Sequence, residues 1–339
     1  MRKLVAILLV FVILVSMPMA CYGQGSVPKE AYTFLVVGHD HAAANTDVLL
    51  LVKYIPKDNS MAILQIPRDT YYHFGGSQNK INQIYPTLAG QNPSTSQQQK
   101  AMQGLSKHIE QVCGLNLDGY MSLTLDDVGA IVDALGGVDL HLPCPISYTS
   151  AKTGELVTIE KGHQHLMGEG AIQFVRYRKG YLEGDIGRVD AQKQFMWAVF
   201  SKIGQQTDIS ALFSLAKVLY RRVHTNIPLP TLLLCARQLY LNASATKLTF
   251  ITLPGQSVRQ KTNRGLWYYA VCKAEAERVM QSYFGGGTFD PTQTLNCKTS
   301  DAISAIYHAP ACEVRIWQHE DITKLDIKTI PNSSPSPIP

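Results

Sequence analysis

Short apolar runs separated by turn sequences open the ordered part of the chain, a pattern that indicates β-strands. The first three runs cover Tyr32–Val37, Asp47–Tyr54 and Met61–Ile66. The sequence Pro56-Lys57-Asp58-Asn59 between the last two is typical of a turn, so we predict a hairpin there.

Helical and strand-like patterns then alternate along the chain. A Gly-, Gln- and Ser-rich stretch, 90–99, predicts a surface loop. Apolar residues recur at helical spacing in six segments: Lys100–Val112, Asp126–Leu135, Gly168–Val175, Arg188–Ile203, Ala211–Arg222 and Pro230–Leu241. Further strands are predicted at Val138–Leu142, Leu248–Leu253 and Glu313–Trp317. This alternation predicts an α/β layered domain with a mixed sheet.

The chain begins with a targeting segment, which we place at residues 1–23. Arg2 and Lys3 precede an apolar run from Leu4 to Ala20, which spans roughly 26 Å as a helix. Basic residues before the run and none directly after it predict an anchor in the cell membrane, with the rest of the chain extracytoplasmic. Pro18-Met19-Ala20-Cys21 is an imperfect cleavage and lipidation signal, so a retained anchor and a cleaved or lipidated form both stay open.

Two further regions follow the anchor. Residues 30–284 contain the predicted strands and helices, and we assign them to one domain. Residues 285–339 form a C-terminal extension rich in Gly, Thr, Ser and Pro, and its Pro/Ser tail is expected to be disordered.

Composition excludes some classes of protein. Of the 339 residues, 17% are charged and 45% apolar, which excludes intrinsic disorder for most of the chain. The net charge of +5 is too small to indicate nucleic-acid binding. Beyond Cys21 six cysteines remain, which allow fifteen pairings; we expect a Cys297–Cys312 disulfide, whereas Cys113 and Cys235 fit buried free thiols equally well.

Two aspartates close to strand ends are the first candidates for chemistry. Asp40 ends one apolar strand and Asp47 begins the next, so a connecting loop could bring both carboxylates together. Two hard oxygen ligands suit Mg²⁺ or Mn²⁺ bound to a phosphate substrate, although spacing alone favours two ordinary loop aspartates. His39 and His41 flank Asp40, but in an extended loop they would point away from it, which disfavours zinc.

Arginines within apolar surroundings form the second group. Arg68 follows Ile66-Pro67, and Arg176 and Arg178 lie two residues apart. That pair can converge only where the chain has left the helix by Val175, since residues two apart diverge on a helix. Arginine binds phosphate oxygens in a bidentate manner, while the alternative is a surface arginine with its aliphatic stem against apolar neighbours.

One helix is expected to carry a face that changes in character along its length. The spacing of Arg188, Gln192, Phe195 and Val199 places all four on one side of it. Such a face could hold a phosphate at one end and a hydrocarbon chain further along, or it could be a core-facing stripe with a polar end.

Six motifs in order resemble the LytR-CpsA-Psr family of bacterial cell-wall enzymes, over residues 32–284. They are Asn45-Thr46-Asp47, Ile66-Pro67-Arg68-Asp69-Thr70, Lys80-Ile81-Asn82, Asp133-Ala134-Leu135-Gly136-Gly137-Val138, Val175-Arg176-Tyr177-Arg178 and Asp185-Ile186-Gly187-Arg188-Val189-Asp190-Ala191-Gln192. The resemblance implies a three-layer-like α/β fold, with a central mixed β-sheet flanked by helices and an apolar pocket for a polyprenyl chain.

The resemblance also implies an activity. Family members are phosphotransferases that move a glycopolymer (teichoic acid, capsular or secondary wall polysaccharide), as its phosphate, from a polyprenyl-pyrophosphate carrier to a peptidoglycan sugar hydroxyl. By motif, Asp40 and Asp47 would bind Mg²⁺ or Mn²⁺, and five residues would hold the pyrophosphate: Arg68, Arg176, Arg178, Arg188 and Gln192. Asp185 would be a catalytic base or would orient an arginine; alternatively it is the N-cap of the following helix.

The chain departs from the family pattern at two positions. Asn45 and Ala191 stand where many members carry arginine, and both changes are expected to remove positive charge near the phosphates. These departures allow for weaker catalysis or a different acceptor. Two alternative functions also stay open: a non-catalytic polyprenyl-phosphate-binding regulator of envelope assembly and a polyprenyl-pyrophosphate hydrolase.

Overall fold

The computed structural model describes residues 29–39, 46–72, 80–182, 184–259, 266–287, 289, 314–322 and 327–329. The expected anchor at 1–23, Asp40, His41, Asn45 and the expected Cys297–Cys312 pair lie outside these residues, as does the Pro/Ser tail. Within the described ranges, no helix combines the length and the apolar character that a membrane span requires.

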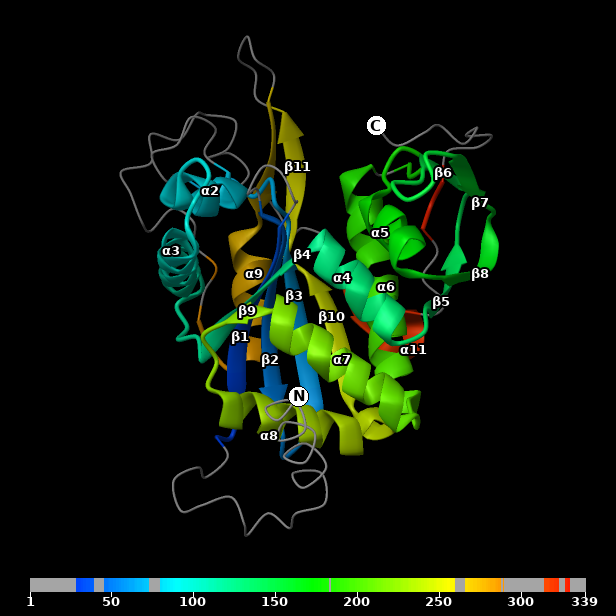
Figure 1. Ribbon diagram of the computed structural model, residues 1–339. Coiled ribbons are helices and arrows are strands. Elements are labelled where there is room, and N and C mark those ends of the chain that lie inside the picture. Colours follow the sequence, from blue (N-terminus) through cyan, green and yellow to red (C-terminus); the bar gives the residue numbers. More distant parts are fainter. Residues whose placement is uncertain are drawn as a thin grey trace.

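A mixed sheet of seven strands forms the centre of the domain (Figure 1). The strand order is β13-β10-β3-β2-β1-β4-β9. Strands β1, β3, β4 and β10 run in one direction, because β1 and β3 both pair antiparallel with β2 while β4 and β10 join them in parallel. The strands are β1 (Tyr32–His39), β2 (Thr46–Ile55), β3 (Ser60–Ile66), β4 (Gly119–Thr124), β9 (His224–Thr225), β10 (Lys247–Thr252) and β13 (Ile316–Gln318).

The predicted hairpin is confirmed. β2 and β3 pair antiparallel from Leu49↔Ile66 to Ile55↔Ser60. In the turn between them Asn59 adopts a φ of 47° and its backbone N–H donates to the Pro56 carbonyl at 3.2 Å. Asparagine tolerates this left-handed conformation better than most residues, which explains its use at the turn.

Helices cover both faces of the sheet. Figure 1 shows α2, α3 and α9 on one side and α4, α6, α7 and α8 on the other. The first group is α2 (Ile84–Ala89), α3 (Thr95–Cys113) and α9 (Lys273–Val279); the second is α4 (Leu125–Ala134), α6 (Asp185–Gln205), α7 (Ile209–Arg222) and α8 (Leu229–Leu241). The expected central mixed sheet between helical layers is therefore confirmed.

The predicted loop over 90–99 is partly wrong, because α3 already begins at Thr95. A capping box starts the helix: the backbone N–H of Gln97 donates to Ser94 Oγ, and the Ser94 N–H donates to Gln97 Oε1 at 2.8 Å. These reciprocal hydrogen bonds satisfy two backbone N–H groups that have no acceptor within the helix. The Ser94–Gln97 spacing could have predicted this start.

Three short antiparallel ladders lie outside the central sheet. The predicted strand Val138–Leu142 (β5) forms, but it pairs with β8 (Gly162–Leu166) instead of joining the main sheet. This ladder packs with α5 (Gly168–Arg176) and α6 in an apolar cluster that includes Leu140, Leu166 and Phe174. The other ladders pair β6 (Ile146–Thr149) with β7 (Leu156–Ile159), and β11 (Gly255–Arg259) with β12 (Trp267–Val271).

The two faces of the central sheet differ in what they contact. Leu35, Val37, Leu49, Leu51 and Leu64 are fully buried and pack with residues of α3 and α9 in one core cluster. Their neighbours along the same strands point to the opposite face, because side chains alternate along a β-strand. That second face turns toward α4, α6, α7 and α8, and a cavity lies there.

The cysteines fall into two groups. Cys113, Cys144 and Cys235 are free and buried, as the sequence allowed for Cys113 and Cys235. Cys272 takes part in a disulfide, and none of the other described cysteines is its partner.

Candidate active site

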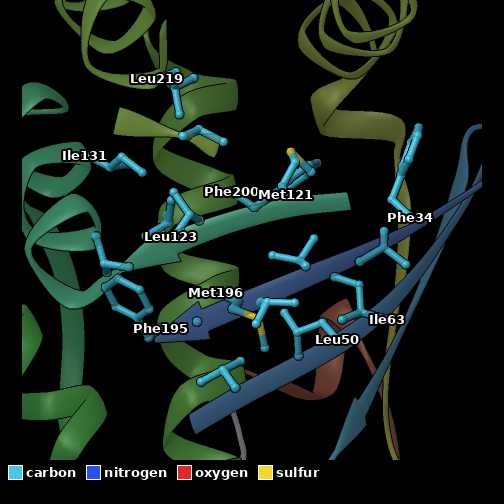
Figure 2. A pocket seen from close by; sticks show the side chains of 18 of the residues that line it. Phe34, Leu50, Ile63, Met121, Leu123, Ile131, Phe195, Met196, Phe200 and Leu219 are labelled. Carbon is cyan, nitrogen blue, oxygen red and sulfur yellow. The ribbon is translucent and has the colours of Figure 1, made fainter. Parts of the chain in front are cut away.

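A cavity of about 1670 Å³ separates the second sheet face from the helices above it. Apolar side chains from both layers point into it (Figure 2). They include Phe34, Leu50, Ile63, Met121 and Leu123 from the strands, and Ile131, Phe195, Met196, Phe200 and Leu219 from the helices. A cavity with such walls is suited to a hydrocarbon chain, which water solvates poorly.

One end of the cavity is charged instead. The lining there comes from the carboxyl ends of β1 and β3, the start of β2, the end of α5 and the start of α6. Ligands commonly bind outside the carboxyl ends of strands in open α/β sheets. The polar residues at this end are His39, Asp47, Arg68, Arg176, Arg178, Lys179, Arg188 and Gln192.

Asp47 occupies a β-bulge. Gly38 pairs with Val48 and His39 pairs with Thr46, so Asp47 has no partner residue opposite it on β1. A bulge redirects the side chain of the extra residue and is common beside active sites. Here it turns Asp47 into the cavity lining, where 28% of its side chain is exposed.

Arg68 lies directly after β3 and contacts this aspartate. Its Nη1 donates to Asp47 Oδ1 at 2.7 Å, and its Nε lies 3.8 Å from Asp69 Oδ2. Asp69 in turn accepts a hydrogen bond from Lys80 Nζ at 2.7 Å. The guanidinium is therefore oriented by two carboxylates while it still lines the cavity.

The pair Arg176 and Arg178 reaches the cavity as proposed, with a small difference in where the helix ends. α5 continues to Arg176, one residue further than convergence was expected to require, and Tyr177 then adopts an extended conformation with φ −63° and ψ 138°. Both arginines line the cavity, and Lys179 joins them. Sequence reasoning missed Lys179, although a third cation directly after Arg178 could have indicated it.

The expected face of α6 is confirmed. Arg188, Gln192, Phe195 and Val199 all line the cavity, so its polar-to-apolar gradient follows one helix. Arg188 and Gln192 are buried. Gln192 accepts a hydrogen bond from Gln65 Nε2 at 2.7 Å and donates from its own Nε2 to the Val175 carbonyl at 3.1 Å.

A buried ion pair fixes α6 against the sheet. Lys193, fully buried, donates to Asp190 Oδ1 at 2.9 Å and to Thr252 Oγ1 on β10 at 2.6 Å. Burial lowers the pKa of this lysine, against the opposing effect of Asp190. Arg315 Nη1 lies 3.5 Å from the other oxygen of Asp190. These contacts hold the helix that carries Arg188 and Gln192 in register with the sheet.

The structure does not confirm the roles expected for Asp40, Asp185 and Ala191. Asp40 lies outside the described residues, and so does the side chain of Asp185. The alternative of Asp185 as N-cap is wrong, because α6 begins at Asp185 and its N-cap is Gly184. Ala191 is fully buried in the apolar cluster with Phe174 and does not line the cavity, unlike Arg188 and Gln192 on the same helix.

A cysteine also lines the cavity, at its apolar part. Burial raises the pKa of the Cys235 thiol to about 12, with a smaller contribution from Asp118. A thiol reacts as a nucleophile through its thiolate, which this environment suppresses. Cys235 therefore belongs to the apolar wall.

The charges define the chemistry that the cavity can support. Among the described lining residues of the charged end, five are cationic (Arg68, Arg176, Arg178, Lys179 and Arg188) and one, Asp47, is acidic. Such an excess suits a di-anionic phosphate group, and the adjoining apolar volume suits its lipid. The fold and cavity thus define a class of α/β protein in which a large apolar cavity ends in a cluster of cations.

The chain belongs to the LytR_cpsA_psr family, which matches residues 19–284. Relatives include the polyisoprenyl-teichoic acid--peptidoglycan teichoic acid transferase TagV of Bacillus subtilis, 26% identical over 264 residues, 75% of this chain and 64% of TagV. The chain thus spans less than two thirds of TagV. TagU of Oceanobacillus iheyensis, named for the same transfer, is 26% identical over 266 residues, 76% of either chain.

Solved structures share the fold. The crystal structure of B. subtilis TagV superposes with a TM-score of 0.58 at 24% identity and covers 72% of this chain and 92% of its own. The structure described as TagT bound to LIIa-WTA gives a TM-score of 0.56 at 20% identity. The match covers 78% of this chain and 95% of the TagT chain. At these identities the likeness extends to the fold alone.

Proposed function

We propose that this protein transfers a glycopolymer, as its phosphate, from a polyprenyl-pyrophosphate carrier to a hydroxyl of a peptidoglycan sugar. The observation that carries the proposal is the single cavity in which Arg68, Arg176, Arg178 and Arg188 adjoin a long apolar volume. The names of the relatives support the same class of reaction. Teichoic acid, capsular polysaccharide and secondary wall polysaccharide all fit as the polymer.

The reaction breaks the phosphoanhydride linkage of the pyrophosphate and forms a new phosphate ester to the acceptor sugar. The acceptor hydroxyl oxygen bonds to the phosphorus next to the glycopolymer, the bridging P–O bond breaks, and polyprenyl phosphate leaves. The hydroxyl proton passes to a base, for which Asp185 is the candidate from its motif. Phosphoryl transfer depends mainly on positioning and charge neutralisation, which the buried Arg188 and its neighbours supply.

A divalent cation fits part of this site. Asp47 offers a hard, partly exposed carboxylate at the charged end, and its second oxygen is not used in the bond to Arg68. We assign Asp47 and Asp40 as the residues that hold Mg²⁺ or Mn²⁺. When bound, the cation supplies further charge neutralisation at the pyrophosphate.

Location follows from the predicted anchor. A carrier lipid and a wall polymer meet at the outer surface of the cell membrane, so the catalytic domain is placed extracytoplasmically. Peptidoglycan, the lipid-linked glycopolymer and the membrane are its partners in this proposal.

Product analysis tests the function. The full chain, in detergent, is incubated with a polyprenyl-pyrophosphate-linked saccharide, peptidoglycan fragments and Mg²⁺, and the products are identified by mass spectrometry. Saccharide phosphate on the fragment, lost in EDTA and in Asp47→Asn, is the expected result. Saccharide phosphate released to water even when fragments are present would assign a hydrolase, and lipid binding without turnover would assign a regulatory binder.

A further inference from the structure

The helices α7 and α8, which close the apolar part of the cavity, have an outer surface of unusual composition. Between Asp208 and Glu275 the chain contains no acidic residue. Within this span α7 and α8 carry four basic residues: Lys217, Arg221, Arg222 and Arg237. A surface of this kind attracts anions over a distance of about a Debye length.

Large apolar side chains are exposed on the same helices. Tyr220 is 70% exposed and Leu229 is 59% exposed, while Leu219 and Leu241 are 40% and 49% exposed. Water solvates such groups at a cost, and exposed apolar residues next to cations are typical of helices that lie in a membrane interface. Tyrosine is also enriched at that interface.

These residues continue directly into the cavity. Leu219, Tyr220 and Leu229 are exposed to solvent and also line the cavity. Lys217 and Arg221 line it beside them. The junction of α7 and α8 is therefore a rim that joins the apolar interior to the surface, while the basic Arg222 is held by Asp127 of α4 at 3.2 Å.

The chain enters the sheet at the same end of the molecule. Tyr32, the first residue of β1, packs with Ile227, Leu234 and Cys235 of the α8 region. It follows the end of the apolar run at Ala20 by twelve residues. The described chain therefore enters β1 on the α8 side of the domain, as the positions of β1 and α8 in Figure 1 show.

We propose that the α7–α8 rim, residues 214–232, docks on the anionic phospholipid surface of the membrane and admits the carrier lipid sideways from the bilayer into the cavity. The proposal rests on the proposed function for the identity of the lipid, but the docking itself does not require turnover. Lys217 and Arg221 would contact phospholipid phosphates, and Tyr220 and Leu229 would enter the interface.

Hydrogen exchange tests the docking. The full chain is placed in nanodiscs with phosphatidylglycerol, in nanodiscs of phosphatidylcholine alone, and in detergent. Amides of 214–232 should exchange more slowly with phosphatidylglycerol than in the other two conditions. Reversal of charge in Lys217→Glu/Arg221→Glu should remove the protection, since each basic residue near an anionic surface contributes about fivefold to binding.

Matched variants separate docking from general effects. Lys100→Glu/Lys107→Glu reverses two exposed charges on α3, across the sheet, and should leave the protection unchanged. Leu229→Asp should remove it, whereas Leu156→Asp, at a residue 64% exposed on β7, should not. Thermal unfolding in detergent identifies any variant that fails to fold, and Tyr220→Ser then replaces it.

Three outcomes overturn the proposal. They are equal exchange with and without anionic lipid, an equal effect of the α3 reversals, and protection that rises with protein concentration in detergent, which would assign the rim to a second copy of the chain. Protection without any transfer would leave docking intact and remove the proposed function. Transfer without protection would do the reverse.

Discussion

Gln65 on β3 donates a hydrogen bond of 2.7 Å to Gln192 on α6, and both side chains are buried. Because Gln192 also donates to the Val175 carbonyl, one side chain ties together the sheet, α6 and α5. Those are the elements that position Arg68, Arg188 and Arg176. The hydrogen bonds of Gln65 and Gln192 thereby help to fix the positions of these three arginines relative to one another.

Removal of this link should cost both stability and activity. Gln192→Ala leaves the buried amide of Gln65 without its acceptor, so the free energy of unfolding should fall by about 1–3 kcal/mol. Transfer should fall further than this loss of folded protein explains, which chemical denaturation and initial rates on the same sample can separate. The matched control is Gln98→Ala on α3, which removes a hydrogen bond from Gln98 Nε2 to the Pro93 carbonyl. An unchanged rate in fully folded Gln192→Ala would contradict the assigned role.

Asp47 should be distinguishable from its neighbour Asp69. Asp47→Asn removes the charge at the bulge and should slow transfer by about 100-fold or more, at the scale found for lost electrostatic stabilisation. Asp69→Asn affects a carboxylate that binds Lys80 and lies 3.8 Å from Arg68 Nε, but Asp69 is not part of the cavity lining, so its effect should be smaller. Rates are measured across a Mg²⁺ titration. Identical Mg²⁺ dependence in Asp47→Asn and the parent would argue against metal binding there.

Arg188 should require its guanidinium and not only its charge. Arg188→Lys keeps the cation but loses the planar pair of donors that matches phosphate oxygens. Transfer should fall about 100-fold in Arg188→Ala and remain clearly impaired in Arg188→Lys. Arg259→Ala, at an exposed residue on β11, serves as control. Full activity in Arg188→Lys would reduce the role of Arg188 to that of a point charge.

Cavity volume should set the length of lipid that is accepted. Ile63→Trp fills part of the apolar wall without touching the charged end. Donors with long prenyl chains should therefore lose kcat/KM relative to short ones, because only the long chain needs the filled volume. The ratio of the two substrates is the readout, and Leu156→Trp on the surface is the control. A ratio that does not move would place the lipid elsewhere.

Stability should depend on pH through His108. Burial lowers the pKa of this imidazole, whose Nδ1 lies 2.7 Å from the Tyr72 hydroxyl oxygen. In the window below the ordinary pKa of about 6.5 the unfolded chain binds a proton that the folded chain does not, so stability falls as pH falls. Denaturation midpoints between pH 7.5 and 5 should show this decline. A slope unchanged in His108→Gln would assign it to other groups.

Much of the architecture was predictable from local pattern. The turn residues Pro56–Asn59 between two apolar runs predicted the hairpin, and helical spacing predicted the shared face from Arg188 to Val199. Both are confirmed. The short strands β6, β7, β8, β11 and β12 were missed, since strands of four or five residues give little periodicity. Their pairing depends on contacts distant in sequence.

The site was predictable in part, for a different reason. Motifs indicated the arginines, because guanidinium groups among apolar residues are unusual. The bulge at Asp47 depends on pairing between β1 and β2, which sequence does not display. Ala191 illustrates the same limit: its place beside Gln192 suggests proximity to phosphate, yet neighbours on a helix diverge by about 100° and it faces an apolar cluster.

The apolar cavity also has a thermodynamic consequence. Where the sheet meets a cavity of about 1670 Å³, its side chains pack less completely than Leu35 and Leu49, which are fully buried on the other face. A prenyl chain that binds in the cavity would supply the missing apolar contacts, so lipid binding and folding are linked equilibria. At a carrier concentration of about 100 times its dissociation constant, the linkage contributes about 2.7 kcal/mol to the folded state. The concentration of carrier lipid would then affect the fraction of the protein that is folded, and through it the resistance of the protein to degradation.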